Sequence, residues 1–354
     1  MPSGKQIEKA PGPCGLGEVK SDRSPAYEHP IDSDEVYTEE EQRHIIHRID
    51  RRLITVLSCL YIISLVDRIN ISAAAIAGSN EDLGLQVGSR YSVIILMFFV
   101  TYIIFQPLGT FLTRKIGPRW FLSSIALAWG AVMIGNGFVN SWESLAGLRV
   151  LVGTFEAGFF PGAVYLLSTW YTRFDMQKRY TLFYGIGCVA GALGGILAYG
   201  LSHMEGLGGL RGWRWIFVIE GIISCLAALF SYIYLVGFPE ESHHSWKFLT
   251  RQERDFVIRR VNSDRGDAIT ASFSLLEFLK PAKDFKVWVF AMIFFCVTTI
   301  GYSINYFLPI ILLGMGESAC SPFPAVSYAY LLALPTLSFP RSLYHISALR
   351  KHSA

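Results

Sequence analysis

Between Leu145 and Trp170 the chain is apolar for long enough to cross a lipid bilayer, yet this run contains one arginine and one glutamate. A charge at membrane depth costs a few kcal/mol or more, so a chain that keeps Arg149 and Glu156 there must compensate for them. The two residues are seven positions apart, close to two turns of an α-helix, and we expect both to project from one face. The run therefore predicts a membrane helix with a polar face.

A second apolar run, from Leu53 to Ala77, also contains charged side chains. Asp67 and Arg68 are adjacent in this run, and Asn70 follows shortly after them. Adjacent residues are about 100° apart on a helix, so we expect Asp67 and Arg68 to point in different directions. Two apolar runs that each hold an acid and a base indicate a polar path through a membrane rather than a simple anchor.

The composition favours a membrane protein. Charged residues make up only 17% and hydrophobic residues 52% of the chain, and the mean hydropathy is +0.37, whereas soluble domains average roughly a quarter charged residues. A net charge of +3 is too small to indicate a nucleic-acid partner. The six cysteines have no CxxC spacing and lie mostly in apolar runs, and the adjacent histidines His243 and His244 lie in a polar stretch. We therefore predict no disulfide framework, no metal site and no cofactor.

Seven stretches reach the length of roughly 20 apolar residues that a membrane-spanning helix needs. They cover residues 53–76, 91–112, 119–139, 145–168, 182–202, 215–236 and 287–313. Lysine and arginine are alternately dense and sparse in the connections between these stretches. Because basic residues accumulate on the cytoplasmic side, the alternation predicts a cytoplasmic N-terminus and a cytoplasmic connection after the sixth span.

The predicted organisation is all-α and has consecutive parts of different character. They are a disordered cytoplasmic N-terminus (1–37), a six-helix domain (38–236), a cytoplasmic central loop (237–286), a seventh span (287–313) and an irregular tail (314–354). No signal peptide is expected, because residues 1–52 have no hydrophobic core. Thr38 with Glu41, and Thr250 with Glu253, have the spacing of capping boxes, so each pair predicts the start of a short surface helix.

Glycines recur at four-residue steps in two of the predicted spans. Gly158 and Gly162 lie in the fourth span, and Gly187, Gly191 and Gly195 lie in the fifth. Stripes of small residues let helices approach closely in a membrane. They predict tight packing, which is compatible with a moving transporter and with a static bundle alike.

Several stretches of the chain resemble the anion:cation symporters of the major facilitator superfamily, closest to the fungal allantoate and nicotinate permeases. The resemblance rests on RIDRRLITVLSCLYIISLVDRINISAA (48–74), RKIGPRW (114–120), RVLVGTFEAGFFPGAVYLLSTWYTRFDMQKR (149–179), GWRWIFVIEGI (212–222) and YSINYFLPIIL (302–312). These stretches look like the first span, the turn after the second, the fourth span with its exit, the entry to the sixth, and the seventh span of that family.

The resemblance covers about residues 38–316 and implies a fold of two six-helix halves with the substrate held between them. On that fold, this chain has the N-terminal six-helix bundle and a seventh span, with most of the C-terminal half missing. The sequence from Glu317 onward is unlike the family, and Thr113 and Arg114 stand where the basic turn of the family has an acid. We therefore expect a chain that is truncated after the seventh span.

The resemblance also implies roles for the charged residues of the first and fourth spans. Asp67 and Glu156 would carry protons, and Arg68 and Arg149 would engage the anion. Arginine offers a permanent positive charge and a planar fork that matches a carboxylate. An anionic substrate would compete with the acids for the guanidinium groups, and this competition would couple anion binding to proton binding. The alternative is structural: the opposite charges neutralise each other and fix the packing of the helices.

Weaker candidates for substrate contact are polar or aromatic residues within the predicted spans. They are Asn70, Tyr184, Tyr302, Asn305 and Tyr306. For each of these residues, a role in packing or at the membrane interface is the simpler interpretation. Glu220 is a further acid in an apolar run, and the sequence indicates no role for it.

The sequence thus predicts a secondary transporter that carries a small organic anion, such as nicotinate, allantoate or a related carboxylate, together with a proton by alternating access. We expect an integral protein of the plasma membrane, a monomer at full length, whose partners are the bilayer, the anion and the proton, with no nucleic acid. The alternative is a truncated or misassigned gene product of the same family that does not transport. No enzyme is expected, because the motifs GxxxxGK(S/T), HExxH and GxSxG are missing from the sequence.

Overall fold

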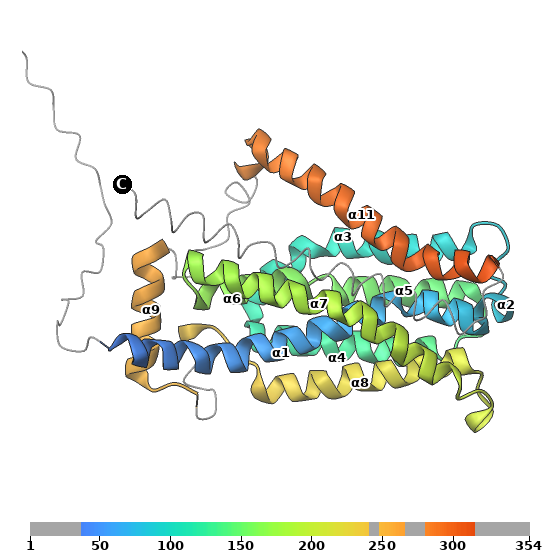
Figure 1. Ribbon diagram of the computed structural model, residues 1–354, viewed down its shortest axis with the longest axis horizontal. Coiled ribbons are helices and arrows are strands. Elements are labelled where there is room, and N and C mark those ends of the chain that lie inside the picture. The colour runs from blue at the N-terminus through green and yellow to red at the C-terminus, as the bar shows by residue number, and fades with distance from the viewer. Residues whose placement is uncertain (1–36, 241–247, 266–279, 316–354) are drawn as a thin grey trace, which may run out of the picture. The chain divides into compact units, whose positions relative to one another are not determined.

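The computed structural model describes residues 37–240, 248–265 and 280–315, and all regular elements in these ranges are helical (Figure 1). The elements are α1 (Glu39–Ala74), the π-helix η1 (Ala75–Ser79), α2 (Asn80–Asp82), α3 (Arg90–Ile116), α4 (Pro118–Asn136), α5 (Trp142–Glu156), α6 (Phe159–Trp170), α7 (Arg173–Ser202), the 3₁₀-helix η2 (Leu207–Gly209), α8 (Gly212–Tyr234), α9 (Arg251–Arg265), the 3₁₀-helix η4 (Lys280–Lys283) and α11 (Phe285–Gly314). Residues His243 and His244, nearly all of the predicted N-terminal segment and the tail from residue 316 lie outside the described residues.

The chain divides into two compact units, Met1–Gln42 and Arg43–Ala354. In the first unit, the backbone N–H of Thr38 donates to Glu41 Oε2 at 2.9 Å, and the N–H of Glu41 donates to Thr38 Oγ1 at 3.4 Å. These reciprocal bonds form the predicted capping box, which is thereby confirmed. The second unit contains the rest of α1 and all the other helices that the structure describes.

Each of the seven predicted spans lies largely within helical structure. Among the described residues, five helical stretches are long and apolar enough to cross a membrane: Glu39–Asp82, Arg90–Ile116, Trp142–Trp170, Gly212–Tyr234 and Phe285–Leu312. The predicted third and fifth spans correspond to α4 and α7, which are not among these five.

The predicted span 145–168 is divided rather than continuous. Helix α5 ends at Glu156, and α6 begins at Phe159. The two helices still form one stretch of 29 residues that is long enough to cross a membrane. The division matters because it places the carboxylate of Glu156 at a helix terminus in the interior of the bundle.

Glycines let the helices touch at this division and elsewhere. A Cβ atom on Gly109 of α3 would lie 2.2 Å from the Cα atom of Gly158, so only glycine fits there without displacement. A Cβ on Gly162 would lie 2.7 Å from a side-chain oxygen of α3, and one on Gly187 would lie 2.6 Å from the ring of Tyr61 on α1. The close packing predicted for these three stripe glycines is therefore confirmed.

Helices α4 and α8 run side by side (Figure 1). A Cβ on Gly130 of α4 would lie 2.9 Å from the sulfur of Cys225, and a Cβ on Gly221 of α8 would lie 2.7 Å from the backbone nitrogen of Ile134. Trp129 and Met133 of α4 are fully buried. This close pair fixes α8 against the bundle and determines which of its side chains reach the interior.

Replacing Gly109 with valine is expected to destabilise the bundle by about 1–3 kcal/mol, because the added atoms overpack the contact with Gly158. The measurement is the temperature at which the detergent-solubilised protein loses its monodisperse elution peak. Gly147→Val is the matched control, because it places the same β-branched residue on helix α5 where a Cβ meets nothing within 4 Å. Equal losses in both variants would show that helix propensity, not this contact, controls the stability.

Helix α11 confirms that the seventh predicted span is helical. The structure buries none of its most apolar window, and α11 contacts α1 and α3 through a few aromatic residues. The Tyr91 hydroxyl of α3 donates to the carbonyl oxygen of Tyr306 at 3.0 Å, and the rings of Phe99 and Tyr302 lie 5.1 Å apart. These contacts bring Tyr302 and Tyr306 to the charged residues of α1.

Candidate functional site

Five acidic or basic side chains are buried in the helical interior of the part of the chain that the structure describes. They are Asp67 and Arg68 of α1, Arg149 and Glu156 of α5, and Glu220 of α8, with exposed fractions of 1%, 6%, 2%, 1% and 2%. The two arginines and three acids lie in membrane-span candidates. A buried charge is stable only when it is paired or hydrogen-bonded, so the partners of each group reveal how the cluster is built.

Glu156 pairs with Arg68 across two helices. The Nε atom of Arg68 donates to Glu156 Oε1 at 3.1 Å, its Nη2 atom binds the same oxygen, and the hydroxyl of Ser64 also donates to it. Ser64 lies one turn before Arg68 on α1, so both donors face α5. The second carboxylate oxygen of Glu156 has no hydrogen-bond partner among the described residues.

This arrangement corrects the grouping of Arg149 with Glu156 as one pair. A separation of seven residues is about 10 Å along a helix axis, which is too far for the two side chains to meet directly. The sequence correctly placed both residues in the interior, but the partner of Glu156 comes from α1. Arg68 and Glu156 together therefore form the central ion pair of the site.

Aromatic rings surround the guanidinium of Arg68. It lies 4.8 Å from the ring centre of Tyr102 and 5.5 Å from that of Phe98, both on α3. Its Nη1 atom donates to the hydroxyl of Tyr302, and the hydroxyl of Tyr306 donates to the carbonyl oxygen of Arg68 at 3.0 Å. The structure thus brings two of the weaker sequence candidates on α11 to Arg68. Nothing in the sequence pattern distinguished the two rings of α3.

Asp67 points away from this ion pair, as the sequence predicted. Its Oδ2 atom accepts from the indole N–H of Trp129 on α4 at 3.2 Å and from the hydroxyl of Ser224 on α8 at 2.6 Å. Its Oδ1 atom has no partner in the described part of the chain. Nothing in the sequence pattern indicates Trp129 and Ser224 as partners, because one tryptophan and one serine in a membrane span carry no periodic signal.

Arg149 is a buried cation that lacks direct partners for its Nε and Nη2 atoms among the described residues. Its guanidinium lies 5.5 Å from the ring centre of Phe217 on α8, and it interacts electrostatically with both Asp67 and Glu156. Both carboxylate oxygens of Glu220 also lack a partner within the described ranges. Glu220 interacts electrostatically with Asp67 and Arg149, so these three residues form a second group of charges, next to the Arg68–Glu156 pair.

The other sequence candidates lie in different surroundings. Asn70 is 1% exposed, and its side-chain nitrogen has no partner among the residues that the structure describes. The side-chain oxygen of Asn305 on α11 is buried and likewise without a partner there. Tyr184 of α7 stacks on Tyr180 at 6.3 Å and lies 6.5 Å from the ring of Tyr61. Tyr184 thus belongs to an aromatic cluster between α1 and α7.

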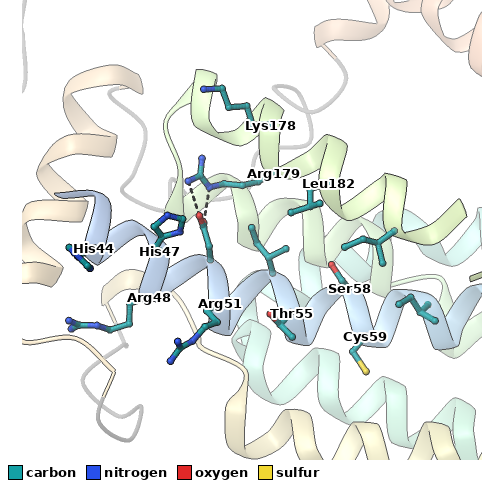
Figure 2. A pocket seen from close by; sticks show the side chains of 14 residues that line it. His44, His47, Arg48, Arg51, Thr55, Ser58, Cys59, Lys178, Arg179 and Leu182 are labelled. Atoms are coloured by element: carbon teal, nitrogen blue, oxygen red, sulfur yellow. Dashed lines mark hydrogen bonds and ion pairs between the residues drawn. The ribbon is translucent and has the colours of Figure 1, made fainter. Parts of the chain in front are cut away.

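A groove of about 1030 Å³ lies between the N-terminal halves of α1 and α7 (Figure 2). Basic side chains line it, among them His44, His47, Arg51 and Lys178, and its apolar part is lined by isoleucine and leucine side chains of both helices. The acid Asp50 also lines the groove, but basic side chains outnumber it. A concave surface with an excess of one sign of charge raises the local concentration of ions of the opposite sign. The groove can therefore attract anions to this end of the bundle.

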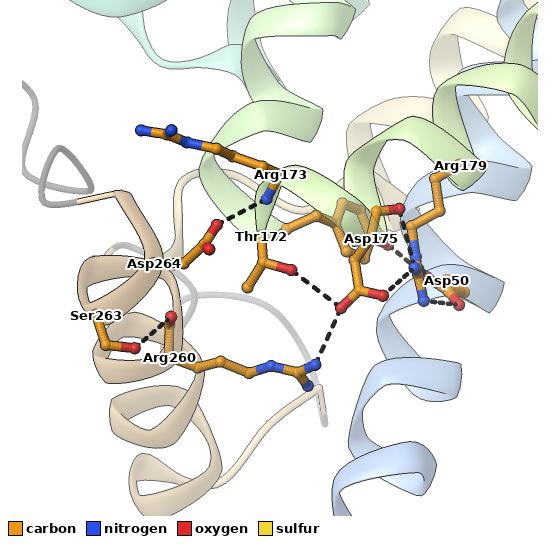
Figure 3. A network of polar contacts seen from close by, with 9 residues as sticks. Asp50, Thr172, Arg173, Asp175, Arg179, Arg260, Ser263 and Asp264 are labelled. Atoms are coloured by element: carbon orange, nitrogen blue, oxygen red, sulfur yellow. Dashed lines mark hydrogen bonds and ion pairs between the residues drawn. The ribbon is translucent and has the colours of Figure 1, made fainter. Parts of the chain in front are cut away.

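A polar network beside the groove ties α1 to α7 (Figure 3). Arg179 holds Asp50 with two bonds, from Nε to Oδ1 at 2.8 Å and from Nη2 to Oδ2 at 3.0 Å. The hydroxyl of Tyr171 donates to Asp50 Oδ1 at 2.7 Å. Burial and the neighbouring Asp50 carboxylate raise the pKa of Tyr171, so its hydroxyl keeps its proton and remains a donor.

Helix α9 is anchored to the start of α7 by two contacts (Figure 3). Arg260 donates to the carboxylate of Asp175 at 3.0 Å, and the carboxylate of Asp264 accepts from the backbone N–H of Arg173 at 2.8 Å. The second contact places a negative charge at the N-terminus of α7, where backbone N–H groups are free to donate.

The other end of α9 confirms the second predicted capping box. The N–H of Thr250 donates to Glu253 Oε2 at 2.8 Å, the N–H of Glu253 donates to Thr250 Oγ1 at 3.3 Å, and Glu253 also pairs with Arg48 of α1 at 3.0 Å. Val257 and Val261 are buried. The helix begins where the sequence predicted, but it is docked on one face rather than surrounded by solvent.

Removing Arg260 is expected to loosen α9. The ion pair described for Arg260, with Asp175, links this helix to α7. A partly exposed ion pair contributes about 0.2–1 kcal/mol, so Arg260→Ala should accelerate limited tryptic cleavage within α9 by about two- to fivefold. Arg259→Ala is the matched control, since Arg259 is the exposed neighbour. Unchanged cleavage of Arg260→Ala relative to this control would show that the ion pair does not hold the helix.

The comparisons with known proteins agree with this fold. The sequence matches the family model of the Major Facilitator Superfamily over residues 57–349, so the chain belongs to this superfamily. With five apolar helical stretches of spanning length among its described residues, it is an integral membrane protein.

The relatives with curated names are fungal transporters. The MFS-type transporter cnsO of Penicillium expansum is 32% identical over 311 residues, which are 87% of this chain and 60% of that protein. The high-affinity nicotinic acid transporter of Saccharomyces cerevisiae is 30% identical over 78% of this chain and 50% of its own length. The chain therefore spans about half to three-fifths of the length of these relatives.

Solved structures show the same fold at low sequence identity. A bacterial homologue of the human lysosomal transporter Spinster, in an inward-facing and occupied conformation, aligns with a TM-score of 0.60 at 15% identity, over 79% of this chain and 58% of that one. A D-xylose–proton symporter aligns with a TM-score of 0.59 at 14% identity, over 86% of this chain and 69% of that one.

Proposed function

We propose that the chain works in a secondary transporter of the anion:cation symporter branch, which carries a small organic anion together with a proton. The observation that carries this proposal is the buried ion pair between Arg68 and Glu156. A guanidinium held by one carboxylate can exchange it for the carboxylate of a substrate, because both bind the same planar fork.

The exchange couples the two ions as follows. The substrate carboxylate takes the N–H donors of Arg68, and Glu156 loses its positive partner. A buried carboxylate without a partner is unstable, so Glu156 binds a proton from the medium and forms an O–H bond. Binding of the anion and of the proton therefore favour each other, and alternating access would release both on the other side of the membrane.

The surroundings of Arg68 suggest the shape of the anion. The rings of Phe98, Tyr102 and Tyr302 lie around the guanidinium, and aromatic rings favour a flat ligand. Nicotinate is a flat carboxylate, and one relative is named a high-affinity nicotinic acid transporter. Allantoate and related carboxylates satisfy the same guanidinium, and the basic groove beside α1 would attract any of them.

The orientation and location follow from the charge pattern. Lysine and arginine are dense in the first turns of α1, around the turn between α3 and α4 and in the connection after α8, which favours a cytoplasmic N-terminus. We assign the protein to the plasma membrane and expect it to act as a monomer, because the anion site proposed here needs residues of one chain only.

Uptake into proteoliposomes tests the proposal. With an acidic exterior, the protein is expected to accumulate labelled nicotinate or allantoate, and a protonophore should abolish the accumulation. Nicotinamide, which has the same ring without the negative charge, should not accumulate. Arg68→Gln should remove uptake, whereas Arg259→Gln on the exposed face of α9 should retain it. Carboxylate uptake that ignores the protonophore would contradict proton coupling.

A further inference from the structure

Glu220 is a buried acid with no role in the exchange described above. It lies on α8 with an exposed fraction of 2%, and neither of its carboxylate oxygens has a hydrogen-bond partner among the described residues. An ionised carboxylate in such a position would cost several kcal/mol. Its burial therefore requires either a nearby positive charge or a bound proton.

The charged groups that act on Glu220 are Asp67 of α1 and Arg149 of α5. Ser224, one turn further along α8, connects the first of them to the same region: its hydroxyl lies 2.6 Å from Asp67 Oδ2 and 2.9 Å from the carbonyl oxygen of Glu220. Helix α4 adds the indole of Trp129, which carries no charge, and the face toward α7 is apolar around Ile216.

The charges of the cluster do not balance when all groups are ionised. The cluster contains two arginines and three acids, and Glu156 is already paired with Arg68. Asp67 accepts two hydrogen bonds, from Trp129 and Ser224, as an ionised carboxylate does, and it is the acid that remains for Arg149. One proton therefore restores neutrality, and we assign it to Glu220, the acid that receives no hydrogen bond from the described residues.

We propose that Glu220 is a third proton-carrying group, which holds a proton in this conformation and shares Arg149 with Asp67. The proton can pass between the two acids: the O–H bond of Glu220 breaks, an O–H bond forms at the unpartnered Oδ1 atom of Asp67, and the charge of the cluster is unchanged. Glu220 then becomes the carboxylate that faces Arg149. The role of Glu220 in coupling rests on the proposed symport. The assignment of a bound proton to Glu220 does not depend on it.

Infrared spectroscopy of the full chain in lipid nanodiscs at pH 7 tests the bound proton. Exposed acids are ionised at this pH, so a protonated carboxyl band reports buried groups. Glu220→Gln is expected to remove this band, whereas Glu143→Gln, at an exposed acid of α5, should leave it intact. If Glu220→Gln does not fold, Glu220→Asp should shift the frequency of the band instead.

The outcomes separate this inference from the proposed function. A band that persists unchanged in Glu220→Gln, or that does not shift in Glu220→Asp, would overturn the assignment of the proton to Glu220. Loss of the band without any proton-driven uptake by the unaltered protein would keep the assignment and reject the symport.

Discussion

Replacing Glu156 with glutamine is expected to uncouple uptake of the anion from the proton gradient. Glutamine keeps the size of the side chain but cannot bind a proton, so the exchange at Arg68 no longer carries a proton. For one proton per anion, each pH unit supplies about 1.4 kcal/mol, or roughly tenfold accumulation. We expect this ratio to fall to about one in Glu156→Gln, while equilibrative exchange of labelled anion persists.

The control for this variant is Glu143→Gln, which removes an exposed acid from the same helix and should accumulate the anion normally. Accumulation ratios should be compared at several imposed pH gradients, because a coupled carrier gives a ratio that rises with the gradient and an uncoupled carrier does not. Full gradient-driven accumulation by Glu156→Gln would rule out Glu156 as the proton carrier.

The helices of this protein are well determined by its local sequence. Apolar length predicted seven spans, each of which lies largely in helical structure in the described part of the chain, and the spacing of Thr38 with Glu41 located the start of α1. Glycines at four-residue steps indicated where backbones meet, as at Gly158. These features depend on neighbours along the chain, so a single sequence is sufficient to find them.

The pairing of the buried charges is not a local property. Whether Glu156 meets Arg149 or Arg68 depends on how α1 and α5 are rotated about their axes. That rotation depends on contacts such as those of Gly153 on α5 with α3 and of Tyr61 on α1 with Gly187. The same reason explains why Trp129 was missed as a partner of Asp67. The burial of the charged residues could be predicted from the apolar sequence around them. Their hydrogen-bond and ion-pair partners could not, because these depend on how the whole bundle packs.

The docking of α9 shows a related limit. Its sequence alternates acidic and basic residues, which is typical of a helix exposed on all sides. Arg260 and Asp264 nevertheless bind the start of α7, and charge alternation cannot distinguish a solvated side chain from one that reaches a neighbouring helix.

Removing Arg149 is expected to have the largest effect on stability of any single change in this cluster. Arg149→Met keeps an apolar contact with Phe217 but leaves the buried carboxylate of Asp67 without a cation, and breaking such an arrangement costs about 3–5 kcal/mol. The protein should lose its monodisperse peak at a much lower temperature than the unaltered chain. Arg51→Met is the control, since Arg51 is exposed on α1.

The double variant Arg149→Met with Asp67→Asn is the decisive comparison. Asparagine still accepts the hydrogen bonds of Trp129 and Ser224 but carries no charge, so the cluster regains neutrality if Glu220 holds a proton. The double variant should then be more stable than Arg149→Met alone, and the double-mutant cycle should give a coupling of at least about 1 kcal/mol. Additive losses would mean that Arg149 does not compensate Asp67, and that the two buried charges are stabilised independently by their own surroundings.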